Sequence, residues 1–170
     1  MEFLLKQISQ LAIKLGDVTF TDEQIKSDWL GNAPASATEI KLAEDRLGVE
    51  LPQDYKDFLL VTNGFSAPND IEPTFEHVSN IDFLKNIDSD LINIWSEVEL
   101  VEIGKELAKS IVIAGINEEQ YFLLIPPDSA GEKWKYWKFA SWHPGEHPYR
   151  NLESYFRSVS HFIRDMVSKG

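Results

Sequence analysis

The chain has no cysteine among its 170 residues, and this absence excludes several kinds of site. Disulfides, thiolate nucleophiles, cysteine-ligated zinc and iron–sulfur clusters all require a thiol. A chain without cysteine also fits a reducing compartment such as the cytoplasm. At this length one domain buries enough surface to fold without a disulfide or a metal, so we expect a single domain over residues 1–170.

Long hydrophobic runs are absent as well. The amino-terminal stretch MEFLLKQISQLAIKLG carries Glu2 and is interrupted by Lys6 and Gln10. A secretory signal starts with basic residues followed by an unbroken apolar stretch, and a membrane span needs roughly 18 consecutive apolar residues. We therefore expect a soluble, cytoplasmic protein that does not enter a membrane.

Basic residues are scarce relative to acidic ones. The chain has 16 Lys and Arg against 28 Asp and Glu, for a formal net charge of −12. This charge argues against binding to nucleic acids or to anionic membranes, because both are themselves negative. It favours a basic protein partner, although acidity can also serve solubility alone.

The first third of the chain predicts helices. Apolar residues at helical spacing between Phe3 and Leu15 indicate an amphipathic helix within an amino-terminal extension, residues 1–35. A helix pair is expected over residues 36–64. Its first helix begins with a capping box formed by Ser36 and Glu39 and ends at Gly48. Its second helix starts near Pro52 and stops at Asn63-Gly64.

The remainder predicts mostly strands for residues 65–142 and a closing helix for residues 151–168. Strands are expected over 110–116, 121–125 and 134–142, with a hairpin connection at 117–120. Segment 78–84 could form a further strand, and 91–101 shows mixed signals. The closing helix carries one apolar stripe. The fold class is therefore α+β, with a helical pair and a closing amphipathic helix packed on a mainly antiparallel central sheet.

The segment EIKLAEDRLGVELPQDYKDFLLVTNGF, residues 39–65, resembles the signature of the SUKH superfamily. This superfamily includes bacterial immunity proteins and yeast-type regulators of cell-wall assembly. The resemblance rests on the order of its elements: Glu44, Leu47-Gly48, Leu51-Pro52, Tyr55, Phe58-Leu59 and Asn63-Gly64. These residues form the core or shape the backbone, so they identify the fold and mark no site.

The resemblance implies a non-enzymatic binding protein without a cofactor. For bacterial members it implies an immunity protein that neutralises a cognate toxin by direct binding. The alternative is a regulatory or scaffolding domain in cell-wall or signalling assembly. Many relatives place a Gly/Asp-rich turn between the central strands, whereas this chain has Asn-Glu-Glu-Gln at 117–120, so the partner's identity does not carry over.

Few residues suggest catalysis or metal binding. His143, Glu146 and His147 could ligate a metal, but Pro144 and Gly145 prevent the shared helical face that such ligands use, which favours an exposed turn. Asp88-Ser-Asp90 has the spacing of a metal-binding acidic pair without a nucleotide-binding framework around it. The alternation in 134–142 favours a strand buried on one face and half-covered on the other, with an exposed aromatic patch as the alternative. We therefore assign no catalytic, cofactor-binding or metal-binding residue.

The distribution of charge gives the partner prediction. Segment 66–102 holds nine acidic residues and one base, Lys85, whereas residues from Lys133 onward have a net charge of +4. An acidic surface suits a toxin with a basic carboxy-terminal domain, such as a basic nuclease, because complementary fields accelerate encounter. The residues assigned to partner binding are Asp70, Glu72, Glu76, Asp88 and Asp90.

Overall fold

The computed structural model describes residues 1–97, 100–129, 131–140 and 145–169. In these ranges one antiparallel sheet has its strands in the order β1-β2-β3-β4-β5, which confirms the expected α+β class. The strands are β1 (Asp82–Phe83), β2 (Ile111–Ala114), β3 (Gln120–Ile125), β4 (Lys135–Ala140) and β5 (Glu146–Tyr149). The helices are α1 (Glu2–Leu15), α2 (Asp22–Ser27), α3 (Ala37–Leu47), α4 (Gln53–Val61), α5 (Leu84–Ile87), α6 (Ser89–Ile94), α7 (Val101–Lys109) and α8 (Leu152–Lys169).

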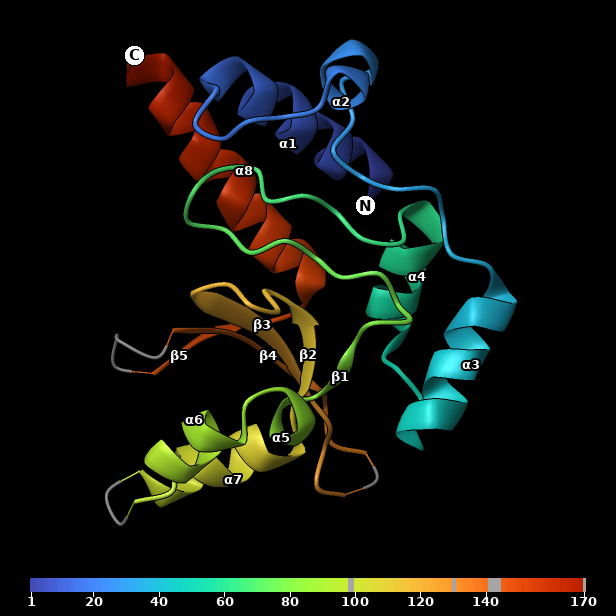
Figure 1. Ribbon diagram of the computed structural model, residues 1–170, viewed down its shortest axis with the longest axis vertical. Coiled ribbons are helices and arrows are strands. Elements are labelled where there is room, and N and C mark those ends of the chain that lie inside the picture. The colour runs from blue at the N-terminus through green and yellow to red at the C-terminus, as the bar shows by residue number, and fades with distance from the viewer. Residues whose placement is uncertain (98–99, 130, 141–144, 170) are drawn as a thin grey trace.

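Helices cover both faces of the sheet (Figure 1). Successive strand residues point to opposite faces, so Phe122 and Tyr136 join the core beneath α8, while Leu123 and Phe139 join the core beneath α5, α6 and α7. On this second face β4 is covered in part, as the alternation in 134–142 predicts: Lys135 is exposed, Trp137 is partly buried and Phe139 is fully buried. Figure 1 also shows α1 lying alongside α8, on the side of α8 away from the sheet.

The helix pair forms as its local signals predict. The Ser36 Oγ accepts from the Glu39 amide at 3.2 Å, and the Glu39 carboxylate accepts from the Ser36 amide at 2.7 Å. Gly48 ends α3 with a left-handed φ of 67°. The end of α4 differs from the prediction, because Thr62 leaves the helix in an extended conformation with φ −155°. After α4, positive φ is found at Gly64 and not at Asn63.

The amino-terminal part contains one helix that the sequence left ambiguous. Thr21 and Gln24 form a second capping box, which starts α2. The side-chain amide of Gln24 donates to Ser66 Oγ at 2.8 Å and so ties α2 to the segment after α4. Beyond α2, single antiparallel bridges place Gly31 beside Phe65, Phe65 beside Phe75, and Phe75 beside Ala114 of β2.

The expectation of mostly strands for residues 65–142 needs correction. Helices α5, α6 and α7 occupy much of the region between β1 and β2, and the possible strand over 78–84 reduces to the two residues of β1. Each of these helices is nine residues or shorter. Isolated helices of this length are marginal in water, so their packing against the sheet stabilises them. That contribution has no local sequence signal.

We expect the Asp54→Ala variant to lose about 2 kcal/mol of unfolding free energy. The Asp54 carboxylate accepts from the Tyr136 hydroxyl and, at 3.1 Å, from the Leu152 amide at the start of α8. Both donors lose their partner in the variant. Urea denaturation measures the loss, and Asp57→Ala on the same helix, an exposed residue, serves as control. Equal stabilities for the two variants would contradict the linking role of Asp54.

Candidate partner-binding site

Acidic side chains from three separate segments meet at the β2–β3 end of the sheet. The Thr74 amide donates to the Glu118 carboxylate at 2.9 Å, and the Gln120 side chain donates to the Ile71 carbonyl at 3.1 Å. These bonds hold segment 69–76 against the turn between β2 and β3. On the other side, the Asp70 amide lies 3.4 Å from the Asp17 carboxylate, beyond the end of α1.

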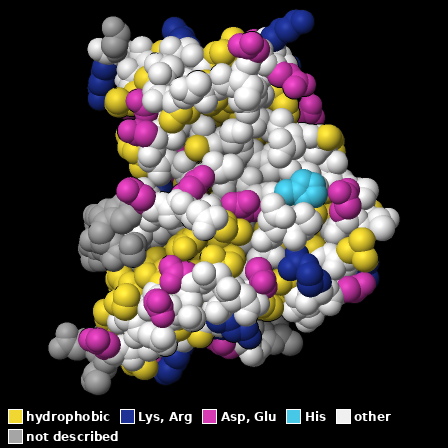
Figure 2. Space-filling model, in the orientation of Figure 1, with side chains coloured by type: hydrophobic (Ala, Val, Ile, Leu, Met, Phe, Trp, Pro, Cys, Tyr) yellow, Lys and Arg dark blue, Asp and Glu magenta, His cyan; other side chains and the backbone are white. Residues whose placement is uncertain are grey.

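We call this region the acid end, defined by Asp17, Asp70, Glu72, Glu76, Glu118 and Glu119. Asp70, Glu72, Glu118 and Glu119 line a shallow hollow of about 280 Å³ together with Ile71, whose side chain is 44% exposed. Figure 2, which shows one face of the molecule, has more acidic than basic side chains on its surface. The acid end thus combines negative charge with an exposed apolar side chain.

Like charges are brought together at Asp70. The neighbouring Asp17 carboxylate raises the pKa of Asp70, first through a shared hydrogen bond and then through electrostatic repulsion. Both side chains are exposed. An external cation placed between them would relieve the repulsion, because an opposite charge stabilises ionised carboxylates. This arrangement suits the acid end to a basic ligand.

Glu72 lies in the same region, but its carboxylate has internal partners. Its Oε2 accepts from the Tyr155 hydroxyl at 2.8 Å and lies 2.9 Å from Lys138 Nζ. The side chains of Glu72 and Lys138 are 11% and 12% exposed. Burial, followed by the Glu72 carboxylate, holds the pKa of Tyr155 well above its usual value, so this hydroxyl stays protonated and donates. Glu72 therefore joins segment 69–76 to β4 and α8.

Glu76 also supports the local backbone. Its carboxylate accepts from the Ile116 amide at 3.1 Å, and partial burial raises its pKa. The bond connects the residue to the start of the β2–β3 turn. Glu76 thus contributes negative charge near the acid end while it helps to hold the turn that presents Glu118 and Glu119.

Asp88 and Asp90 lie away from the acid end, with the helices on the opposite face of the sheet. Asp88 caps α6 by accepting from the Leu91 amide at 3.0 Å, and it also accepts from the Tyr121 hydroxyl at 3.2 Å. Asp90 is exposed in the first turn of α6. The structure therefore groups Asp70, Glu72 and Glu76 and separates these two residues from them.

Sequence reasoning missed three members of the acid end. Glu118 and Glu119 belong to the hairpin connection predicted at 117–120, and Asp17 lies far from them in the sequence. Adjacent acids in a turn are a usable signal for the first two, because hairpin turns project into solvent. Asp17 had no such signal, since only the tertiary fold brings it to Asp70.

The other candidates from the sequence fall partly outside the described residues. Of the histidine segment, His143 and Pro144 lie outside them, whereas Glu146 and His147 belong to β5 rather than to an exposed turn. Trp142 of the aromatic stretch is also outside. Trp137 and Phe139 face the second core, and Phe139 is fully buried there.

The residues that the structure describes were searched for metal-binding groups and for membrane-spanning helices. No group of three or more His, Asp or Glu side chains in them is arranged to hold a metal ion. None of their helices combines the length and the apolar character that a membrane crossing requires.

Comparison with known proteins identifies a family. The SMI1 / KNR4 family (SUKH-1) model matches residues 34–165, whereas the search of curated proteins gave no match. The matched region contains the helix pair, the whole sheet and most of α8, as well as the acid end apart from Asp17. Since the match covers well over half of the sequence and agrees with the signature at 39–65, the chain belongs to the SMI1 / KNR4 family (SUKH-1).

Proposed function

We propose that this chain is a non-enzymatic immunity protein that neutralises a cognate toxin by binding it directly through the acid end. Membership in the SMI1 / KNR4 family is compatible with this role, and the family is not a known enzyme family. The observation that carries the proposal is the convergence of Asp17, Asp70, Glu118 and Glu119 from three segments onto one end of the sheet.

The electrostatic argument favours a basic partner. The whole chain carries a net charge of −12, so its field attracts a basic protein over distances of several ångströms and accelerates encounter. At contact, exposed carboxylates can pair with Lys and Arg side chains. Lys138 pairs with Glu72 of the acid end, and the exposed acids Asp70 and Glu119 remain available to such a partner.

The apolar component comes from Ile71. Residues that contribute most to protein–protein affinity are usually surrounded by polar groups that exclude water from the contact. Ile71 is 44% exposed and lines the same hollow as Asp70 and Glu119. We therefore place Ile71 at the centre of the contact and the exposed acids at its rim, where they govern the association rate and the salt dependence.

We expect the gene directly upstream of this one to encode a toxin, and the test uses the carboxy-terminal domain of that polypeptide. We expect a 1:1 complex by isothermal titration calorimetry, with an affinity that falls as salt increases. The Asp70→Lys/Glu119→Lys double variant is expected to bind on the order of 100-fold more weakly, because two attractive contacts become repulsive, and to lose most of the salt dependence.

The matched control is Glu132→Lys/Asp165→Lys, which makes the same charge change. Glu132 lies in the β3–β4 turn, at the opposite end of the sheet, and Asp165 lies near the end of α8; both are exposed. The control is expected to bind nearly as the parent chain does. Equal weakening by both double variants would show that the total charge of the chain, and not the acid end, determines the affinity. Absence of any complex would favour the regulatory or scaffolding role.

A further inference from the structure

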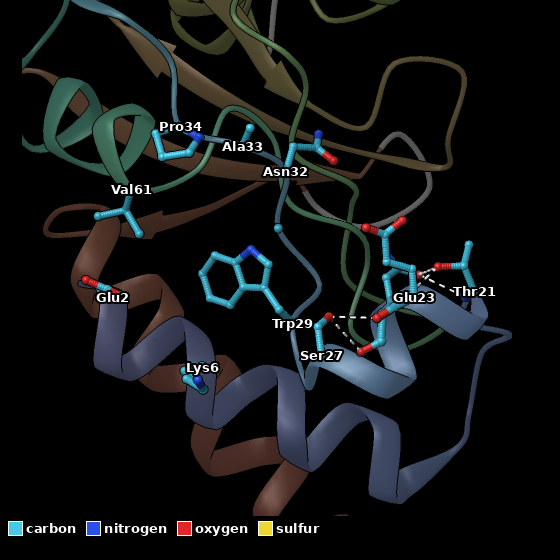
Figure 3. Close-up of a pocket in the computed structure, with 12 residues that line it drawn as sticks. Glu2, Lys6, Thr21, Glu23, Ser27, Trp29, Asn32, Ala33, Pro34 and Val61 are labelled. Atoms are coloured by element: carbon cyan, nitrogen blue, oxygen red, sulfur yellow. Dashed lines mark hydrogen bonds between the residues drawn. The ribbon is translucent and has the colours of Figure 1, made fainter.

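A second hollow, of about 740 Å³, lies between α1, α2 and the segment that leads into α3. Figure 3 shows the indole ring of Trp29 at its centre. Glu2 and Lys6 reach it from α1, Glu23 lies on the α2 side, and Val61 of α4 lies across from α1. We call this hollow the Trp29 site.

The indole ring of Trp29 is held in a fixed position. The indole ring meets the Phe65 ring edge-on, with ring centroids 5.8 Å apart. The backbone amide of Trp29 donates to the Gln24 carbonyl at 3.2 Å. A Cβ at Gly31 would lie 2.6 Å from the ring and 2.3 Å from Thr62 Oγ1. Only glycine therefore lets the ring lie this close to the backbone. The partly buried ring is a preorganised platform, which lowers the entropy lost when a ligand binds.

The charges around Trp29 favour a cationic ligand. Glu2 and Glu23 supply two carboxylates and Lys6 one ammonium group, and in the described part of the chain none of the three forms an ion pair. Trp is the strongest aromatic acceptor for a cation over its face. A guanidinium group is planar, so it can stack on the indole and pair with a carboxylate at the same time.

We propose that the Trp29 site binds an arginine side chain of a protein partner, with the guanidinium stacked on the indole between the carboxylates of Glu2 and Glu23. The match to the family begins at residue 34, so these three residues belong to the part of the chain that precedes the matched region. Pro34 and Val61, which also line the hollow, lie within the matched region. The Trp29 site extends the contact surface beyond the acid end and does not require the partner to be a toxin.

The test uses two blocked tripeptides, acetyl-Gly-Arg-Gly-amide and its citrulline counterpart, which is neutral and has nearly the same shape. The indole N–H signal of Trp29 is assigned by NMR with the Trp29→Phe variant and followed during titration of each peptide. We expect a saturable shift with the arginine peptide and about ten-fold weaker binding, or none, with the citrulline peptide. Glu23→Gln is expected to weaken binding of the arginine peptide about three-fold or more.

Asp22→Asn is the matched control, because Asp22 is exposed in the same turn of α2 and does not line the hollow. It is expected to leave the titration unchanged. Equal affinity for the two peptides, an arginine titration that does not saturate, or equal effects of Glu23→Gln and Asp22→Asn would each overturn the proposal. So would an indole shift that depends on protein concentration alone, since a second copy would then occupy the site. These variants leave Asp70 and Glu119 intact, so failure here is distinct from failure of the acid-end proposal.

Discussion

The Glu72→Ala variant is expected to lose about 3–5 kcal/mol of unfolding free energy, the cost of removing one partner from a buried ion pair. Lys138 would remain mostly buried without its carboxylate, and the Tyr155 hydroxyl would lose its acceptor. The loss would separate segment 69–76 from β4 and α8. Chemical denaturation by urea, followed by far-UV circular dichroism, measures the change.

Two variants separate a structural role of Glu72 from a role in partner contact. The Glu72→Leu/Lys138→Met double variant removes both charges, so it should regain much of the lost stability. Asp70→Asn, which alters an exposed neighbour, should change stability by less than about 0.5 kcal/mol. If Glu72→Ala proves as stable as Asp70→Asn, the Glu72–Lys138 ion pair does not stabilise the fold. Glu72 would then again be a candidate for direct contact with the partner.

The Gly115→Ala variant is expected to lose about 3 kcal/mol or more, because strain and a direct clash coincide there. Gly115 has a φ of +85°, and a Cβ at this position would lie 1.9 Å from the Gln120 carbonyl oxygen. The β2–β3 turn would have to open, which would displace Glu118 and Glu119. Thermal and urea denaturation measure the stability loss.

Gly131→Ala is the control for strain without a clash. Gly131 lies in the β3–β4 turn with a φ of +95°, and a Cβ there would meet no atom within 4 Å. Its expected cost is about 1 kcal/mol, from the unfavourable backbone conformation alone. Similar losses for the two variants would show that the Gly115 contact relaxes without cost.

The candidate site illustrates the limit of a linear charge pattern. Segment 66–102 is acidic throughout, yet the fold places Asp70 at one end of the sheet and Asp90 with the helices on its other face. Within the same segment Glu72 is turned inward to Lys138. Residues adjacent in sequence share a surface only when the chain between them does not cross the core, and here β1 and α5 intervene.

The sequence by itself determined the elements whose signals are local. The capping box of Ser36 and Glu39, the left-handed Gly48 and the apolar stripe of the closing helix each involve residues within a few positions of one another. The same holds for the β2–β3 hairpin. These signals act through backbone hydrogen bonds and side-chain spacing, so they can be read without knowledge of the rest of the fold.

Only the tertiary structure decided the elements that depend on distant contacts. Helices α5 to α7 are too short to be stable alone, and β5 contains Pro148, which is compatible with a strand at the sheet edge because no further strand needs its missing amide. The acid end and the Trp29 site are likewise assembled from separate segments. Their positions follow from how α1, α8 and the sheet pack together, because that packing is determined by apolar burial over the whole chain.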